Sequence, residues 1–172
     1  MASVALKIVI ATDAWNPQIN GVVTSLSHVE DYLRAQGCEV RVIHPGDFHT
    51  FALPNYKEIC VAWNVWKFAE IFESFKPDCV HIATEGPIGL AARRYLTKRG
   101  LPFTTSLHTK FPEYVNQRIG MPVSWGYAFL RWFHEPCKAT LVTTESMRDE
   151  LTARGLKDLV VWTRGVDTQL FS

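Results

Sequence analysis

The architecture of the chain follows from residues 6–36, LKIVIATDAWNPQINGVVTSLSHVEDYLRAQ. The first part is a short, nearly continuous run of apolar and β-branched residues, which is typical of a strand covered on both faces in a parallel sheet. In the last part, four apolar residues are spaced four, three and four apart and share one helix face: Val22, Leu26, Val29 and Leu33. We therefore predict a strand, a loop and a helix.

The junction between this loop and this helix is Asn20-Gly21. A glycine has no side chain, so a ligand can approach the backbone closely there. The first amides of a helix point outward and attract negative charge. Residues 20–22 are therefore a candidate anion site.

The rest of the chain repeats the alternation of strands and helices. We predict strands at 39–43, 78–83, 103–107, 139–143 and 159–162, and helices at 66–75, 88–99, 122–135 and 146–154. Residues 47–64 show weak periodicity and are predicted as loop with at most one short strand. This order predicts a single α/β domain with a Rossmann-like, doubly wound, mostly parallel sheet.

Three details of this prediction concern side-chain placement. The spacing of Trp66, Ala69 and Phe72 predicts the buried side of one helix. In a second helix, the same argument predicts a buried stripe of Trp125, Phe129, Trp132 and Phe133. Ser146 is the predicted N-cap of the last helix.

Length and composition, at 172 residues with 47% hydrophobic and 20% charged, are ordinary for a folded domain. The net charge of +1 hides an uneven distribution, because residues 86–138 carry eight Lys and Arg against two Asp and Glu. This basic segment could face phosphates or an anionic membrane, or it could be a solvated surface. Nucleic acid is not a predicted partner, since neither an RNP motif nor a helix-turn-helix pattern accompanies the charge.

The four cysteines are Cys38, Cys60, Cys79 and Cys137, far apart and without metal-ligand spacing. We expect reduced thiols in a cytoplasmic protein and no metal site. Cys79 is expected to act as a small core residue. We expect no signal peptide, because Lys7 and Asp13 interrupt the first apolar run.

Polar candidates gather in three loops that each follow a predicted strand, at 12–20, 84–87 and 108–114. Carboxyl ends of parallel strands meet at one edge, so these loops should share a rim where ligands bind. The candidates are Asp13, Asn16, Asn20, Glu85, His108 and Lys110. Other roles remain open at this point: Asp13 capping its loop, Glu85 compensating a helix dipole, and His108 as a structural histidine.

Other motif classes are absent from the sequence. A dinucleotide oxidoreductase would show GxGxxG after the first strand and an acidic residue ending the second. Here the turn reads DAWNPQINGV and the second strand ends in His44-Pro45-Gly46. There is also neither a Walker lysine loop nor a GxSxG elbow.

The chain is also rich in tryptophan near basic residues. Trp63 and Trp66 flank a predicted helix, and a second group lies further on: Trp125, Trp132 and Phe133 with Arg118, Arg131 and Lys138. Aromatic rings with cations suit a membrane interface. The alternatives are a core stripe or a contact with another domain.

Several segments together resemble one known family: ATDAWNPQINGVVTSL (11–26), HIATEGPIGLAARRYLTKRGLPF (81–103), TSLHTKFPEYV (105–115), VTTESMRDELTARG (142–155) and WTRGVDTQLF (162–171). They resemble the N-terminal domain of GT-B-fold glycosyltransferases of family 4. The similar branch includes bacterial lipid mannosyltransferases and sulfoquinovosyl- or glucuronosyl-diacylglycerol synthases. The resemblance covers nearly the whole chain in the right order.

This resemblance implies a retaining transfer of a hexose from a nucleotide-diphosphate sugar to an acceptor hydroxyl, without a cofactor or metal. It implies that Asn20, Gly21 and Val22 lie against the donor diphosphate, with Asn20 in place of the first of two glycines common in the family. It implies that His108 lies beside the transferred sugar as the catalytic residue. By the same resemblance the acceptor side is lined by Asp13, Asn16, Glu85, Thr109 and Lys110.

The resemblance also implies that part of the enzyme lies outside this chain. Residues 1–165 match the acceptor-side domain, and residues 166–172 match the start of the linker to a C-terminal donor domain, which is absent. We therefore expect the chain alone to be inactive. Expected partners are the nucleotide sugar, a lipid or glycan acceptor, the donor domain and the inner face of an anionic membrane. The alternatives are a binding module for a glycolipid or polyisoprenoid and an unrelated Rossmann-like nucleotide binder.

Overall fold

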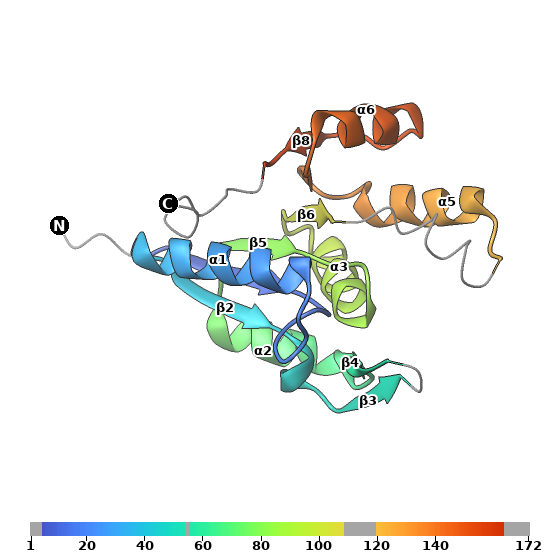
Figure 1. Cartoon of the computed structure of the whole chain (residues 1–172). Coiled ribbons are helices and arrows are strands. Elements are labelled where there is room, and N and C mark those ends of the chain that lie inside the picture. Colours follow the sequence, from blue (N-terminus) through green and yellow to red (C-terminus); the bar gives the residue numbers. More distant parts are fainter. Residues whose placement is uncertain (1–4, 54–55, 109–119, 164–172) are drawn as a thin grey trace, which may run out of the picture.

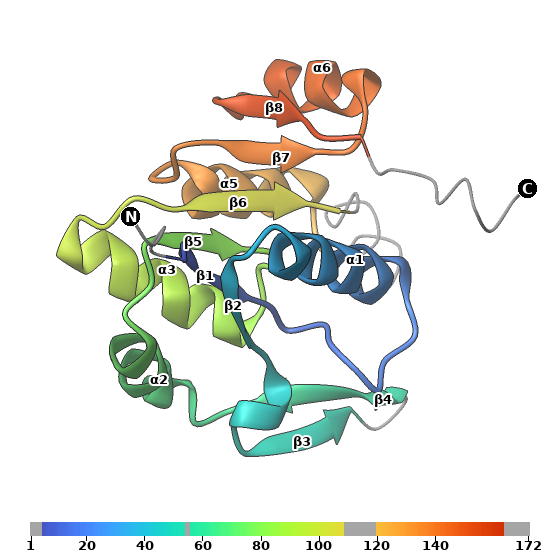
Figure 2. The ribbon, with the colours of Figure 1, turned by 90° about the vertical axis from the view of Figure 1, so that its left-hand side faces the viewer.

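The computed structural model describes residues 5–53, 56–108 and 120–163. Within these ranges, a parallel sheet has the strand order β2-β1-β5-β6-β7-β8, and Figure 2 shows the strands from β8 to β5 stacked in this sequence. The strands are β1 (Lys7–Ala11), β2 (Glu39–Ile43), β5 (Cys79–Ile82), β6 (Thr104–Leu107), β7 (Thr140–Val142) and β8 (Leu159–Val161). The predicted α/β fold with a parallel sheet is confirmed.

Helices cover both faces of this sheet. They are α1 (Gly21–Ala35), α2 (Phe68–Phe75), α3 (Pro87–Arg99), α5 (Val123–His134) and α6 (Glu145–Ala153), with the short 3-10 turns η1 (Pro45–Asp47) and η2 (Val65–Lys67). Ile10 of β1 packs with Leu26 of α1, whereas its neighbour Val9 belongs to the cluster of α2 and α3. Successive strand residues point to opposite faces, so α1 covers one face and α2 and α3 the other.

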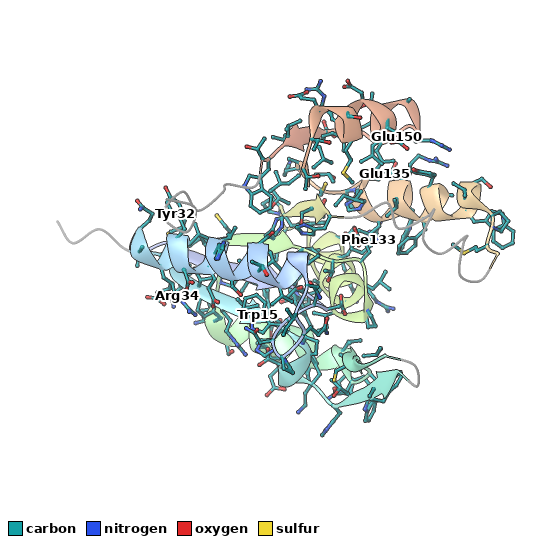
Figure 3. All side chains as sticks on the ribbon, in the orientation of Figure 1. Trp15, Tyr32, Arg34, Phe133, Glu135 and Glu150 are labelled. Carbon is teal, nitrogen blue, oxygen red and sulfur yellow. The ribbon has the colours of Figure 1, made fainter. Side chains whose placement is uncertain are left out.

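A third apolar cluster extends the core toward β8. It joins α5 and α6 to the sheet through Leu107, Leu130, Val142 and Leu151. Phe133 is fully buried in the cluster with α3, and Figure 3 places it between α3 and α5. The helices on this face therefore pack on one another as well as on the strands.

The order of the strands reverses between β1 and β5. From β1 the chain goes to β2 on one side, and it returns to β5 on the other side. In open α/β sheets, ligands bind at such a reversal, beyond the carboxyl ends of the strands. Figure 2 shows the start of α1 on the side of the sheet to which the arrowheads of β5 and β6 point. The predicted shared rim is confirmed for loops 12–20 and 84–87 and for His108, while residues 109–114 lie outside the described ranges.

The prediction of loop for residues 47–64 is wrong. This segment contains an antiparallel hairpin of β3 (Thr50–Leu53) and β4 (Tyr56–Ala62), whose register shifts between Ala52 and Leu53. The hairpin lies at the end of the molecule away from α6 and β8 (Figure 1). One strand is short and the pairing is irregular, so the sequence shows no sustained alternation.

Several side-chain placements also differ from the predictions. Trp66 lies in η2 and is 67% exposed, whereas α2 buries Phe68 together with the predicted Phe72. Apolar side chains lie on two faces of α5, so their spacing alone does not decide which face is buried. The structure exposes Trp125 and Trp132 and buries Tyr127, Leu130 and Phe133.

Two smaller corrections concern the last helix and the cysteines. The N-cap of α6 is Thr144, whose hydroxyl accepts a hydrogen bond from Met147 N at 3.1 Å, and not Ser146. Cys79 is exposed and Cys137 is buried, so the cysteine in the core is not the predicted one.

Candidate functional site

Asp13 connects the two strands on either side of the reversal. Its Oδ1 accepts a hydrogen bond from Ile88 N at 2.8 Å, and its Oδ2 accepts from Gly89 N at 3.3 Å. The hydroxyl of Thr84 donates to Oδ2 at 2.8 Å and accepts from the backbone N of Asp13 at 2.7 Å. Asp13 in the loop after β1 is thus the side-chain cap of α3, whose own N-cap residue, Gly86, has none.

Two glycines, Gly86 and Gly89, allow the close packing around this carboxylate. A Cβ atom on Gly86 would lie 2.5 Å from Asp13 Cγ, and one on Gly89 would lie 1.9 Å from the carbonyl oxygen of Thr84. Burial raises the pKa of Asp13, and hydrogen bonds from Ile88, Thr84 and Gly89 oppose this rise. Both carboxylate oxygens therefore have partners inside the protein, as expected for a residue that fixes the corner between the first loop and α3.

The start of α1 is capped by its own loop. Asn20 Oδ1 accepts hydrogen bonds from Val22 N and Val23 N, both at 3.0 Å, and its Nδ2 donates to Gln18 Oε1 at 3.3 Å. The amide of Val22, a predicted donor-binding group, is therefore held by Asn20. Asn20 and Gly21 are exposed. An anionic oxygen would take the position that Asn20 Oδ1 now occupies.

The loop between Asp13 and Asn20 leads into this helix start. Gln18 is buried and its Nε2 donates to the carbonyl oxygen of Asp13 at 3.5 Å. Trp15 packs onto the α1 side of the sheet near the start of the helix, whereas Tyr32 and Arg34 lie toward its other end (Figure 3). Asn16, a predicted acceptor-binding residue, is exposed in this loop.

His108 follows β6 and is held by a chain of side-chain hydrogen bonds. Its Nε2 lies 2.8 Å from Ser106 Oγ, which lies 3.1 Å from His81 Nε2 in β5. His81 Nδ1 in turn lies 2.9 Å from Thr104 Oγ1. Thr104, Ser106 and His108 are two residues apart, so they share one face of β6, and His81 pairs with Thr104 across the strands.

Burial gives His81 an unusual titration. Desolvation, followed by the nearby His108, lowers the pKa of His81 to about 4. The ring of His81 is therefore uncharged at neutral pH. One of its nitrogens donates a hydrogen bond while the other accepts one.

Glu85 turns toward a different histidine. Its Oε1 lies 3.4 Å from Nε2 of His134, near the end of α5, and His134 Nδ1 lies 2.8 Å from Thr105 Oγ1. Both of the facing atoms are buried, and neither makes a hydrogen bond within the described structure. Thr105 is on the opposite face of β6 from Ser106, so the two histidine networks are separated by the sheet. Glu85 therefore contributes one buried oxygen to the packing of α5.

The sequence patterns singled out none of His81, His134, Thr84 and Ser106 as site residues. The signal for Ser106 was its spacing of two from His108 on a predicted strand. The partners on β5 and α5 depend on strand register and helix rotation, which the sequence does not display. The predicted site residues Thr109 and Lys110 lie outside the described ranges.

Some cations of the basic segment (86–138) make contacts within the protein, and others are exposed to solvent. Arg93 joins α3 to α5, since its Nε donates to Phe133 O at 2.8 Å and its guanidinium lies 3.8 Å from the ring centroid of Trp132. Arg99 contacts Glu73 at 3.0 Å, and Arg131 donates to Arg154 O at 3.0 Å. Arg94, Lys98 and Lys138 are exposed. Part of the segment is therefore structural and part faces solvent.

The tryptophans are mostly on the surface. Trp63, Trp66, Trp125 and Trp132 are 53%, 67%, 68% and 48% exposed, whereas Phe133 is buried. The core-stripe alternative is wrong for these four and correct for Phe133. No helix among the described residues is long and apolar enough to cross a bilayer. Across the same residues, no three His, Cys, Asp or Glu side chains group as a metal site requires.

Comparison with known proteins adds a family and three relatives. Residues 19–170 match the family model described as Glycosyltransferase Family 4. The chain is 23% identical, over 96% of its length, to a GDP-mannose-dependent alpha-mannosyltransferase of Corynebacterium glutamicum, and 25% identical, over 97%, to one of Mycobacterium tuberculosis. It is 30% identical, over 64% of its length, to an alpha-monoglucosyldiacylglycerol synthase of Acholeplasma laidlawii, of which it covers 32%. The chain spans about half the length of the two mannosyltransferases, 45% and 49%.

Proposed function

The chain belongs to glycosyltransferase family 4, and from this premise we propose that it is the acceptor-side half of a retaining hexosyltransferase. The whole enzyme moves a hexose from a nucleotide-diphosphate sugar to an acceptor hydroxyl and keeps the anomeric configuration. The bond between the anomeric carbon and the diphosphate oxygen breaks, and a bond to the acceptor oxygen forms. The acceptor's hydroxyl proton passes to the departing nucleoside diphosphate, which carries away the electron pair of the broken bond.

The observation that carries this proposal is the rim of the sheet at the strand reversal. It brings the start of α1 and the end of β6 to the same edge, so residues 20–22 and His108 can face one ligand. His108 Nε2 lies 2.8 Å from Ser106 Oγ, and this contact supports a fixed ring orientation toward the proposed sugar position. The proposed role of His108 is to stabilise the reacting sugar through a positioned polar contact.

The start of α1 suits the negative charge of the donor. The amides of Val22 and Val23 already bind an oxygen, that of Asn20, and a helix N-terminus carries partial positive charge. A diphosphate oxygen that displaces Asn20 Oδ1 would receive the same two hydrogen bonds. Gly21 leaves this approach open because it has no side chain.

On the acceptor side, the described residues differ in availability. Asn16 is exposed and is proposed to contact the acceptor. Asp13 is hydrogen-bonded to the start of α3, and Glu85 lies against His134 of α5. We therefore propose that both shape the acceptor wall more than they bind the acceptor. Thr109 and Lys110 remain candidates by family resemblance.

We propose that a second domain forms the other half of the crevice. The leaving diphosphate needs preorganised cations, and such electrostatic stabilisation is usually the largest catalytic contribution. We propose that a C-terminal donor domain supplies them, with residues 166–172 at the start of the linker. The 172 residues alone should not turn over.

A lipid-linked acceptor is proposed from the surface of the molecule. Exposed Trp125 and Trp132 share the α5 region with Arg131 and Lys138, and tryptophan with cations suits the headgroup layer of an anionic membrane. The name of the Acholeplasma relative refers to a diacylglycerol lipid. We propose a cytoplasmic protein, peripheral on the inner face of the membrane.

Vesicle sedimentation tests the membrane part of the proposal. The chain should sediment with phosphatidylglycerol vesicles more than with phosphatidylcholine vesicles, and salt should weaken this, because exposed charges are screened over about 8 Å at physiological ionic strength. Trp125→Ala should reduce binding, whereas Tyr32→Ala, at an exposed ring near the far end of α1, should not. Binding that ignores lipid charge and salt would contradict the proposal.

Sugar transfer is tested with a fusion of this chain to a family 4 donor domain. The fusion should transfer mannose or glucose from GDP-mannose or UDP-glucose to a diacylglycerol or other lipid acceptor, and the unfused chain should not. Turnover by the unfused chain would refute the need for a second domain. A fusion that binds the lipid and never turns over would favour the binding module.

A further inference from the structure

The hydrogen-bonded chain behind His108 contains a second histidine that family resemblance does not assign. His81 is on β5, one strand away, and reaches His108 only through the hydroxyl of Ser106. Ser106 Oγ is also 3.3 Å from the carbonyl oxygen of Ala83, to which it can donate. A single hydroxyl hydrogen thus has three acceptors within reach.

The hydrogen bonds that link Thr104, His81, Ser106 and His108 can be donated in two complete arrangements. In the first, Thr104 donates to His81 Nδ1, His81 Nε2–H donates to Ser106, and Ser106 donates to His108 Nε2. In the second, His108 Nε2–H donates to Ser106, Ser106 donates to His81 Nε2, and His81 Nδ1–H donates to Thr104. Thr104 then donates to the carbonyl oxygen of Val80, 3.5 Å away.

The two arrangements differ in the direction of every donor, and each uses a neutral His81. When His108 changes from acceptor to donor at Nε2, the hydroxyls rotate and His81 changes tautomer. No charge has to be placed on His81, which suits its burial and the lowered pKa described above. A backbone N–H in the place of the Ser106 hydroxyl could not follow such a change, because it can only donate.

We propose that His81 and Ser106 are positioning residues for His108, which hold its ring by Nε2 and accept either hydrogen-bonding state of that atom. The functional meaning of this inference rests on the proposed transferase activity. The coupling between His81 and His108 does not rest on that activity, because it can be measured in the 172-residue polypeptide alone.

The first test uses the unfused 172-residue chain with ¹⁵N-labelled histidine. We expect His81→Leu to move the Nε2 resonance of His108 and His81→Gln to restore most of it, since the Gln amide can place a donor and an acceptor near the position of Nε2. Ser106→Ala should move the resonance furthest. An unchanged His108 resonance in His81→Leu and Ser106→Ala would overturn the proposal.

The second test measures kinetics in the two-domain fusion. His81→Leu should lower kcat roughly 10-fold with KM for the donor nearly unchanged, as for other residues that orient a reacting side chain through one hydrogen bond. His81→Gln should recover most of kcat. The matched control is Thr140→Val, which removes a buried hydroxyl on β7 that bonds to Thr105 at 3.0 Å. This variant should lose stability and keep kcat.

The outcomes separate the two proposals. If no variant or parent fusion transfers sugar while the His108 resonance still responds to His81, the positioning chain stands and the proposed function fails. If the parent transfers sugar and His81→Leu matches it in kcat, the positioning role fails. A loss of kcat in His81→Leu that His81→Gln does not recover would indicate a packing effect and would also contradict the proposal.

Discussion

Asp13 follows β1 and His108 follows β6, on either side of β5 in the sheet. Their polar atoms have different kinds of hydrogen-bond partner. The carboxylate of Asp13 accepts from two backbone amides of α3, which cannot turn. The Nε2 of His108 meets a hydroxyl, which can rotate. A group held by fixed donors is an anchor, whereas a group held by a rotatable donor can change its hydrogen bonding during a reaction.

Burial also shifts the pKa values of Asp13 and of His81, the histidine behind His108, in opposite directions. Burial raises the pKa of Asp13, whose ionised form is the costly one, and lowers the pKa of His81 behind His108. Asp13 therefore belongs to the framework of the fold, whereas His108 belongs to the proposed site. The following predictions test whether Asp13 acts mainly on stability and His108 mainly on turnover.

The largest effect is expected for His108→Ala in the two-domain fusion. Loss of a positioned polar side chain at the reacting sugar should lower kcat roughly 10²- to 10³-fold, equivalent to about 3 to 4 kcal/mol. The melting temperature should change little, because His108 is at the end of a strand. The comparison breaks if His108→Ala unfolds the chain or leaves kcat unchanged.

Acid should destabilise the His81 region by a nearly comparable amount. The unfolded chain binds a proton at the ordinary pKa of 6.5 and the folded chain only at about 4. Between these values the unfolded state holds more protons, so the free energy of unfolding should fall as pH falls, by about 3 kcal/mol in total. Denaturant unfolding across this window measures the fall.

His81→Leu should remove this part of the acid sensitivity. Asp13 contributes with the opposite sign, since its raised pKa adds stability below the ordinary value of 3.8 and loses it as pH rises through the folded-state pKa. An acid slope in His81→Leu as steep as in the parent chain would contradict this prediction.

Asp13→Ala should cost about 2 to 3 kcal/mol of stability. Two amides of α3 and the Thr84 hydroxyl lose their acceptor, and relief of the buried carboxylate offsets part of the loss. Asp13→Asn is the matched control, because its oxygen can still accept from Ile88 N, and it should lose less. Thermal unfolding of the 172-residue chain measures these losses. Equal stability of the parent and Asp13→Ala would contradict the anchoring role of Asp13.

The smallest effect is expected at the start of α1. Asn20→Ala should destabilise the chain by about 1 kcal/mol, because Val22 N and Val23 N lose their cap, whereas Asn20→Gly should cost a few tenths. In the fusion, Asn20→Gly should keep or improve the KM for the donor, since the diphosphate no longer displaces a side chain. A large loss of donor binding in Asn20→Gly would instead make Asn20 a direct ligand.

Local patterns were sufficient for the framework of the fold. The β-branched run at 7–11 and the apolar spacing at 22–33 predict β1 and α1 closely, because each element repeats its own period over enough residues. The hairpin at 50–62 and the buried face of α5 could not be predicted in this way. One has a short and irregular alternation, and the other has apolar residues on two faces.

The candidate site was predictable only as a set of loops. That three loops share an edge follows from parallel connections, so the location of Asp13, Asn20 and His108 could be inferred. Their partners could not, since Ile88 is 75 residues from Asp13 and the contact depends on how α3 sits against β1. The pairing of His81 with Thr104 likewise depends on the register of β5 and β6.

The most direct test of the account is a crystal structure of the two-domain fusion with a nucleotide-diphosphate sugar. We expect the hexose to contact the ring of His108 while a diphosphate oxygen accepts hydrogen bonds from the amides at the start of α1. A hexose bound at the opposite edge of the sheet, or one that touches α1 with His108 turned away from it, would contradict it.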